Sequence, residues 1–216
     1  MPPATERAAL PPIEDLISEL VSGSVAPIRQ KAGRILTDLS RLDHAVYEAV
    51  ASTETPALDE PLRRLSNAAN RSAIWVAIAA AVALLGGRRG RRAAAAGLIS
   101  IGVSSALVNV GLKSIASRRR PDRSAARVLD ERHVVMPEST SFPSGHSASG
   151  FAFATAVGRD LPWLAFPLRL LAAAVAYSRV HTGVHYPGDA VAGSLVGGAT
   201  GLVVAGALDR RAGGLR

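Results

Sequence analysis

The stretch Phe142-Pro143-Ser144-Gly145-His146 decides how the rest of the chain is interpreted. It is a turn of small residues that ends in a histidine and runs directly into the apolar segment 147–157. A serine hydroxyl and a glycine N–H at the start of a helix can face an anion, because the helix dipole favours negative charge there. A histidine beside them can give or take a proton near neutral pH. The stretch therefore predicts an anion site with an acid–base group next to it.

The composition favours a membrane protein. The chain has 216 residues, a hydrophobic content of 48% and a formal net charge of +8. A basic balance usually indicates nucleic acid or an anionic membrane surface. Aromatic residues make up only 4% of the chain, which leaves few rings to stack on bases. We therefore expect membrane lipids as partners and no nucleic acid. Acidic residues among the first twenty positions spoil a secretory signal segment, so internal spans are expected to anchor the chain.

The apolar segments predict an all-α, membrane-embedded helical bundle. Residues 13–53 carry apolar side chains at helical spacing with charges between them, which indicates amphipathic helices at a surface or interface. About five membrane helices are expected to follow, over 73–87, 93–112, 147–157, 164–177 and 190–208. Several of these segments are short and rich in alanine, so a soluble helical bundle is the alternative. In the last segment, close helix packing is expected at four glycines: Gly193, Gly197, Gly198 and Gly201.

The positions of apolar segments predict the domain limits, and basic residues predict the orientation of the chain in the membrane. We expect an amphipathic region over 1–70, a membrane domain over 71–210 and a tail over 211–216. The short basic loop from Arg88 to Arg92 belongs in the cytoplasm by the positive-inside rule. This orientation places His146 and the other polar clusters at the extracytoplasmic face. The N-terminal region then lies outside, lies along the interface, or follows a re-entrant segment.

Three cations flank the apolar segments. Lys113 precedes Arg120 with six residues between them, and Arg179 closes a later apolar segment. Together they could hold a phosphate dianion, arginine by bidentate donation and lysine as a point charge. We interpret Arg118 and Arg119 as ordinary membrane-flanking charges. The polar loop from Arg118 to Phe142 is long for a compact domain, and its part 122–141 is expected to contact a headgroup.

Two of the five histidines stand beside groups suited to an anion. His185 opens the last apolar segment, and Asp189 can reach back from the first helical turn to one ring nitrogen of His185. The carboxylate would fix the tautomer and leave the other nitrogen free to attack. His146 would then protonate a leaving oxygen. His44 and His133 are interpreted as structural.

These clusters resemble, in order, the three signature motifs of the type 2 phosphatidic acid phosphatase family, which shares its site with vanadium haloperoxidases and bacterial acid phosphatases. The resemblance covers about residues 73–208, and each motif position holds the expected residue. The matching residues are Lys113, Arg120-Pro121, Pro143-Ser144-Gly145-His146, Ser178-Arg179, His185 and Asp189.

The resemblance implies a metal-independent phosphomonoesterase that needs no cofactor. Phosphate would be bound by five residues: Lys113, Arg120, Ser144, the Gly145 N–H and Arg179. His185 would attack phosphorus to form a phosphohistidine, oriented by Asp189. His146 would act first as general acid on the leaving group and then as base on water.

The resemblance also limits the substrate to lipid phosphates. Membrane members act on phosphatidate, phosphatidylglycerophosphate, polyprenyl pyrophosphates and polyprenyl phospho-sugars. The arginine- and alanine-rich composition suggests a GC-rich bacterial genome, which makes decaprenylphosphoryl-5-phosphoribose of cell-wall synthesis an alternative substrate. One departure concerns the N-terminus: common bacterial members have six spans, and an amphipathic region stands here where the first span is expected.

Two other functions compete with this interpretation. A His/Asp metal-dependent membrane hydrolase would use His181, His185 and Asp189, which recur every four residues. Gly183 and Pro187 interrupt the helix that such a site needs, and a metal does not explain the three cations. A transporter or scaffold with a degenerate site would be expected to lack a histidine or an arginine, and none is missing.

Overall fold

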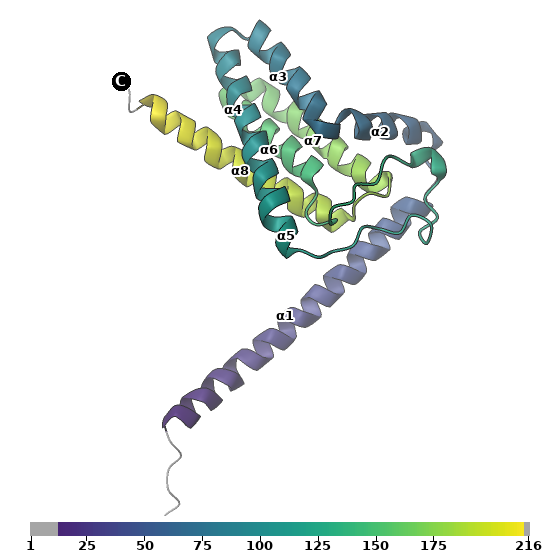
Figure 1. Cartoon of the computed structure of the whole chain (residues 1–216), viewed down its shortest axis with the longest axis vertical. Coiled ribbons are helices and arrows are strands. Elements are labelled where there is room, and N and C mark those ends of the chain that lie inside the picture. The colour runs from purple at the N-terminus through teal and green to yellow at the C-terminus, as the bar shows by residue number, and fades with distance from the viewer. Residues whose placement is uncertain (1–12, 214–216) are drawn as a thin grey trace, which may run out of the picture. The chain divides into compact units, whose positions relative to one another are not determined.

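The structure is a computed structural model that describes residues 13–213, with side chains described over 30–211, and within these limits every regular element is helical. The predicted all-α class is thus confirmed for this part of the chain (Figure 1). The α-helices are α1 (Ile13–Ser52), α2 (Pro56–Ala68), α3 (Ala73–Leu85), α4 (Gly87–Ala106), α5 (Lys113–Ile115), α6 (Gly145–Asp160), α7 (Pro162–His181) and α8 (Pro187–Gly213). Two 3-10 turns, η1 (Asn70–Ser72) and η3 (Asp130–Arg132), and a π-helical segment, η2 (Leu107–Leu112), complete the elements.

The chain divides into two compact units between Leu42 and Asp43. The first unit contains most of α1, a helix of 40 residues whose last part belongs to the second unit. The amphipathic region therefore folds as α1 and α2, separated at Thr53–Thr55. Pro56 lies at the start of α2, where its missing N–H costs no helical hydrogen bond. The second unit, 43–216, contains the candidate site.

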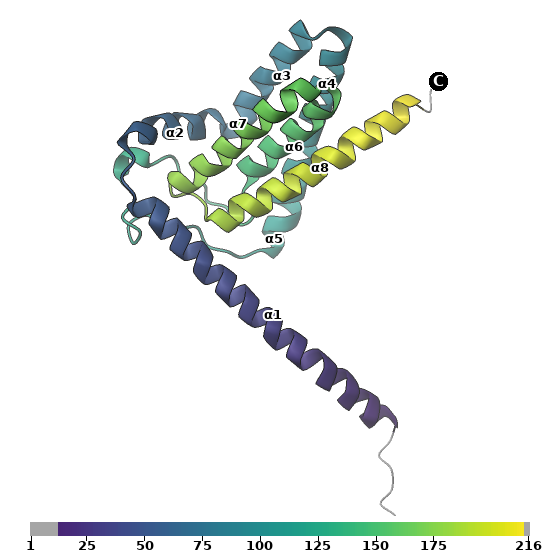
Figure 2. The ribbon, with the colours of Figure 1, turned by 180° about the vertical axis from the view of Figure 1, so that it is seen from behind.

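Helix α6 is the centre of the second unit. It packs against α4, α7 and α8, as Figures 1 and 2 show from opposite sides. Most of its side chains are small and buried, and Phe153 fills the space toward the fully buried Trp75 of α3, with ring centroids 5.5 Å apart. In a bilayer, close van der Waals packing of such small and aromatic side chains helps to hold neighbouring helices together.

Glycines bring α8 close to α6. A Cβ added at Gly197 or Gly201 would lie within 2.6 Å of a carbonyl oxygen of α6, and one added at Gly193 would lie 2.3 Å from the carbonyl oxygen of Ser144, the residue that caps α6. The predicted close packing is confirmed at these three positions. At Gly198 a Cβ would meet only the Oγ1 of Thr155, at 4.0 Å, so this glycine faces away from the contact.

Four of the five apolar segments lie in one continuous helix each, but their lengths differ, and the segment 73–87 runs past the end of α3 at Leu85 to the start of α4. By length and composition, three helices can cross a membrane: Gly87–Ile115, Pro162–His181 and Pro187–Arg211. The bent pair Pro56–Ala68 and Asn70–Leu85, with an angle of 64° between its halves, makes a fourth if it is one span. The fifth, α6, has 16 residues and is enclosed by its neighbours.

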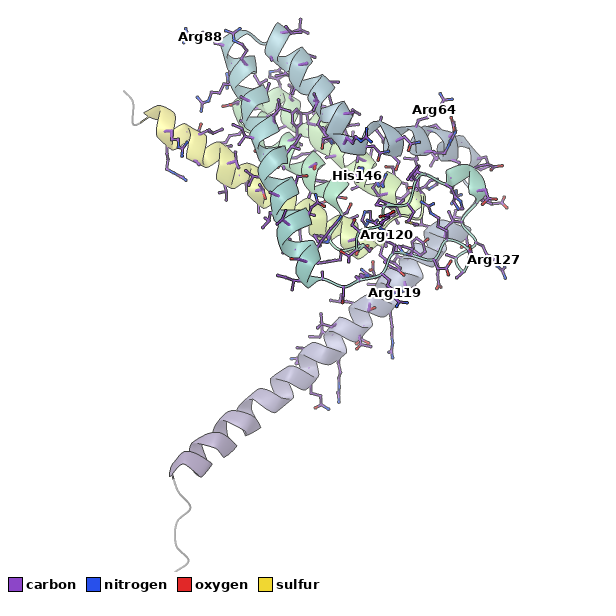
Figure 3. All side chains as sticks on the ribbon, in the orientation of Figure 1. Arg64, Arg88, Arg119, Arg120, Arg127 and His146 are labelled. Carbon is purple, nitrogen blue, oxygen red and sulfur yellow. The ribbon has the colours of Figure 1, made fainter. Side chains whose placement is uncertain are left out.

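The second unit has two chemically different ends. At one end ion pairs join the start of α4 to the ends of α6 and α8: Arg92 contacts Asp160 and Asp209, and Arg159 Nε lies 2.8 Å from Asp209 Oδ2. The ends of α5 and α7 and the starts of α6 and α8 lie at the other end. Figure 3 shows Arg88 at the first end and Arg120 and His146 toward the second. The stretch Arg88–Arg92, expected from the sequence to be a loop, instead forms the first turns of α4. The three polar sequence clusters therefore meet at the end opposite this basic stretch.

Candidate active site

A cavity of about 210 Å³ lies where the polar clusters meet. Its lining includes five of the residues predicted for the site: Lys113, Arg120, Gly145, His146 and His185. Each comes from the end of an element or from a loop beside one. The start of α6 faces this cavity through Gly145 and His146, so the positive end of the α6 dipole is directed toward it. The cavity is therefore suited to an anion.

The turn after α7 positions His185. Gly183 has φ +68°, a left-handed conformation that ends the helix, and its added Cβ would lie 3.0 Å from Arg123 Cγ. The backbone N–H groups of Val184 and His185 both donate to the carbonyl of Arg179, at 3.0 and 3.1 Å. The chain thus folds back over the end of α7, and this fold holds the imidazole at the cavity wall.

The two ring nitrogens of His185 face opposite charges. Nδ1 lies 3.5 Å from Asp189 Oδ2, and Nε2 lies 3.3 Å from Arg120 Nη1. A guanidinium can only donate, so Nε2 accepts and the ring proton is assigned to Nδ1, on the side of the carboxylate. Burial, together with the cations of Arg120 and Arg179, lowers the pKa of His185 to about 4, although Asp189 acts in the other direction. His185 is therefore neutral at pH 7, with the Nε2 lone pair directed toward Arg120.

Asp189 lies fully buried in the first turn of α8, beside the ring of His185. Its Oδ2 accepts from the Tyr186 N–H at 2.9 Å and from the Ser141 hydroxyl, and its Oδ1 accepts from Arg118 Nη1 at 2.9 Å. The bond to Tyr186 is the helix-start contact in which an acidic side chain of the first turn caps the preceding N–H. Three donors thus fix the carboxylate 3.5 Å from His185 Nδ1, a distance at which the two groups form an ion-pair contact but no hydrogen bond. That Asp189 orients the imidazole stays a prediction.

The two cations Lys113 and Arg120 both form hydrogen bonds to the polar loop. Arg120 donates from Nε to the Ser139 carbonyl at 2.8 Å and from Nη1 to the Val184 carbonyl at 3.0 Å. Lys113 Nζ donates to Ser139 Oγ at 3.1 Å. Ser139 thus links both cations, and it also lines the cavity. The π-helical segment η2 directly precedes Lys113. Short π-helical segments are frequent at functional sites.

His146 contacts a residue that sequence reasoning missed. Its Nε2 lies 3.0 Å from Asn70 Oδ1, at the break between α2 and α3. The next two residues, Arg71 and Ser72, have φ of 53° and 59° and line the cavity. Left-handed conformations cost free energy in residues other than glycine and are found most often at functional sites. Nothing in the sequence marks this break, because it contains neither glycine nor proline.

Two predicted phosphate ligands lie behind the cavity wall. Ser144 is fully buried, and its Oγ accepts from the N–H and hydroxyl of Ser147, at 3.4 and 3.0 Å, which makes it the cap of α6. Arg179 is 1% exposed and donates from Nη1 to Ser66 Oγ at 2.6 Å. Its Nε–H has no hydrogen-bond partner within the described side chains. The Ser144 hydroxyl thus serves the helix, whereas Arg179 retains one free donor.

The structure does not contain the helix that a metal site would need. Helix α7 ends at His181 and α8 begins at Pro187, so His181 and Asp189 do not share one helical face. His181 Nε2 lies instead 2.9 Å from Asp59 Oδ1. Among residues 30–211, no three His, Cys, Asp or Glu side chains lie close enough to form a metal site.

Comparison with known proteins shows to which family the chain belongs. The family model of the PAP2 superfamily matches residues 93–212, more than half of the chain. A decaprenylphosphoryl-5-phosphoribose phosphatase of Mycobacterium tuberculosis is 34% identical over 162 residues, which cover 74% of this chain and 87% of the relative. The protein of the same name from Mycolicibacterium smegmatis is 35% identical and covers 73% and 84%. A lipid A 4'-phosphatase of Bacteroides thetaiotaomicron is 31% identical over 106 residues, 46% of this chain and 47% of that protein.

Solved structures share the fold. The transmembrane PAP2 type phosphatidylglycerolphosphate phosphatase of Bacillus subtilis superposes with a TM-score of 0.61 at 24% identity, covering 80% of this chain and 87% of that one. Aquifex aeolicus LpxE gives a TM-score of 0.59 at 23% identity, covering 76% and 94%. The family expected from the three motifs is confirmed: the chain belongs to the PAP2 superfamily.

Proposed function

We propose that this chain is a membrane lipid phosphate phosphatase that works through a phosphohistidine on His185. The observation that carries the proposal is the pair of contacts on one imidazole, Asp189 behind Nδ1 and Arg120 in front of Nε2. These contacts leave a neutral nitrogen facing a cavity that also holds Lys113 and His146. A phosphate placed there meets a nucleophile, two cations and an acid–base group at once.

In the first step the Arg120 guanidinium donates to a phosphate oxygen in place of His185 Nε2, and the freed lone pair of Nε2 attacks phosphorus as the bond from phosphorus to the lipid-side oxygen breaks. The bond pair goes to that oxygen, which takes a proton from His146 and leaves as an alcohol. The imidazole of His146 carries this proton once the phosphate dianion is bound, because the dianion offsets the cations around the ring. The positive charge that develops on the His185 ring is stabilised by the Asp189 carboxylate. Lys113 and Arg120 stabilise the negative charge on the equatorial oxygens, which is the largest contribution that a site makes to phosphoryl transfer.

In the second step water attacks the phosphohistidine. His146, now neutral, takes a proton from the water, and the phosphorus–nitrogen bond breaks with its electron pair returning to Nε2. Inorganic phosphate leaves, and both histidines regain their starting states. The unpaired Nε–H of the buried Arg179 supports a further contact to phosphate, because an unsatisfied buried donor is costly until a ligand accepts from it.

The substrate we favour is a polyprenyl phospho-sugar phosphate. Two relatives of 34–35% identity, each aligned over 73–74% of this chain, are named for decaprenylphosphoryl-5-phosphoribose. By its name that molecule carries two anionic groups, the 5-phosphate and the phosphoryl link to the lipid. Arg71 adds a third cation to the cavity lining, beyond Lys113 and Arg120. A second anion on the substrate would use this extra charge.

The active site is proposed to open at the extracytoplasmic face. The cavity lies at the end of the bundle opposite the basic first turns of α4, where Arg88 is labelled (Figure 3). The positive-inside rule assigns these arginines to the cytoplasm. The lipid headgroup would therefore enter the cavity from the outer leaflet.

Phosphate release by the purified protein tests the function. We expect faster release from a polyprenyl phosphoribose phosphate than from phosphatidate, phosphatidylglycerophosphate or a polyprenyl pyrophosphate, with activity retained in EDTA. Release from none of the four would refute the lipid phosphatase, and a clear preference for phosphatidate would refute the substrate.

Two variants test the assigned roles. His185→Ala is expected to abolish turnover, and a variant with near-normal activity would refute the nucleophile.

His146→Ala should retain more activity on an aryl phosphate than on a lipid phosphate, because an aryl leaving group needs no proton. Equal losses on both substrates would contradict the role of His146 as acid.

A further inference from the structure

Arg118 bridges two carboxylates. From the sequence alone we interpret it as an ordinary membrane-flanking charge. Its Nη1 lies 2.9 Å from Asp189 Oδ1, and its Nη2 lies 2.5 Å from Asp43 Oδ2. The guanidinium also stacks on the ring of Tyr186, with Cζ 4.1 Å from the ring centroid. A planar fork held on two edges and one face has little rotational freedom. Arg118 is therefore fixed in one place, unlike an ordinary charge at the end of a span.

Asp43 holds the other side of this arrangement. Its Oδ1 accepts from the Gly188 N–H at 2.6 Å, so the carboxylate stabilises the first turn of α8. A Cβ at Gly188 would lie 3.0 Å from Asp43 Oδ2, so the missing side chain lets the carboxylate approach. Asp43 and Asp189 thus contact the same helix start, and Arg118 lies between them.

The charge of Asp189 explains why a cation is needed there. The carboxylate is fully buried, and an isolated buried charge is strongly unfavourable. His185 cannot compensate for it in the resting state, because its imidazole is neutral at pH 7. Among the described side chains, Arg118 is the Lys or Arg that forms an ion pair with Asp189. The guanidinium thus keeps Asp189 ionised and aimed at His185 before a substrate arrives.

We propose that Arg118 is a positioning residue for the His185–Asp189 pair, and that Asp43 in turn positions Arg118. This proposal rests on the proposed function, since it assigns an effect on the nucleophile. Arg118 does not line the cavity, so it acts on the rate and leaves phosphate binding to Lys113 and Arg120.

The test compares Arg118→Gln with Arg119→Gln on an aryl phosphate. Arg119 is the adjacent, exposed arginine, and it provides a matched loss of one charge. We expect Arg118→Gln to lower kcat about tenfold to a hundredfold with KM within about twofold, because a small misplacement of reacting groups has effects of this size. Arg119→Gln should leave both constants unchanged. A rise in KM at constant kcat, or equal effects of the two variants, would overturn the proposal.

Two further variants separate positioning from folding. Arg118→Lys keeps the charge but cannot bridge both carboxylates, so it should recover only part of kcat while its melting temperature stays near that of the parent protein. Asp43→Asn should lower kcat less than Arg118→Gln. Because Asp43 acts through Arg118, adding Asp43→Asn to Arg118→Gln should cause no further loss, whereas multiplying losses would show independent roles. Full recovery by lysine would also overturn the geometric argument.

The outcome can be told apart from a failure of the proposed function. If the parent protein releases no phosphate, or if His185→Ala retains its activity, the nucleophile assignment fails and with it the enzyme mechanism. If the parent protein is active, His185→Ala is inactive and Arg118→Gln has normal kcat, then only the positioning role of Arg118 is wrong.

Discussion

The two motif histidines share one cavity but differ in what surrounds them. His185 lies between a carboxylate and a guanidinium, whereas His146 faces the side-chain amide of Asn70. A carboxylate stabilises the charged form of an imidazole, and a neutral amide does so much less. The environment of His185 thus suits a nucleophile that becomes positively charged during the reaction. His146 is left dependent on the charge of the substrate phosphate for its protonated form.

The pH at which the His185 imidazole becomes protonated tests whether this residue is neutral in the resting site. Burial and nearby cations lower its pKa to about 4, so the imidazole is protonated only below that pH and is neutral across the range where free histidine titrates. We expect nitrogen-15 NMR of histidine-labelled protein in detergent to show a midpoint near 4 for the signal that His185→Gln removes. Arg120→Gln should move this midpoint upward, because it removes a positive charge 3.3 Å from Nε2. A midpoint near 6.5 in the parent protein would contradict the buried, neutral state.

The sequence predicted residues with unusual chemistry better than residues with ordinary chemistry. Lys113, Arg120, His146 and His185 stand out because cations and histidines beside apolar spans are costly without a function, and all four line the cavity. Ser139 escaped prediction because one serine in a polar loop resembles any other. Arg118 escaped because its partners come from α1 and α8, and no local pattern shows that they meet it.

At the scale of elements, the site is built from helix ends. Helix α6 presents its start, α7 its last turn, and α8 its first turn, and their distances depend on how closely α6 and α8 pack. The Ser144 N–H donates to the Asp189 carbonyl at 2.9 Å, which joins the two starts directly. The glycines of α8 therefore help to hold Asp189 in place relative to the start of α6.

Substitutions on the α8 glycines test this coupling. Gly197→Ala would place a Cβ 2.1 Å from the Ala148 carbonyl oxygen, so the helices must separate, at a cost of about 1–3 kcal/mol. We expect a lower melting temperature in detergent and a reduced kcat, because α8 carries Asp189. Gly198→Ala is the control, since its Cβ meets only an atom at 4.0 Å, and it should change neither quantity. Equal effects of the two variants would argue against the close contact.

Element predictions were good where hydrophobicity sets the boundaries and weaker where tertiary contacts do. Four of the five apolar segments fall within one helix each, because a charge-free run buries its side chains most easily as a helix in a bundle or bilayer. The break at Asn70–Ser72 left no signal, since its left-handed residues are held by packing and not by glycine. The length of α6 was also undecided in the sequence, where its 16 residues look like a short span.

For the whole molecule, the central feature is the separation of the two ends of the bundle. Arginines and their carboxylate partners gather at the starts and ends of α4, α6 and α8 on one side, and the cavity lies on the other. The continuous helix Gly87–Ile115 runs from the basic stretch to the cavity and has 29 residues, which makes it about 43 Å long, so the two ends stand more than a hydrocarbon thickness apart. The site and the basic start of α4 are then expected on opposite faces of a membrane.

The absence of cysteine from the sequence permits a clean test of this orientation. Single-cysteine variants at Arg89, in the first turn of α4, and at Glu131, in the polar loop, both place the thiol at an exposed position. In intact cells a membrane-impermeant maleimide should label Glu131→Cys at once and Arg89→Cys only after the membrane is permeabilised. Labelling of Arg89→Cys alone in intact cells would place the cavity in the cytoplasm. The lipid phosphate would then be hydrolysed at the inner leaflet, before any flipping of the lipid, although the chemistry of the site would be unchanged.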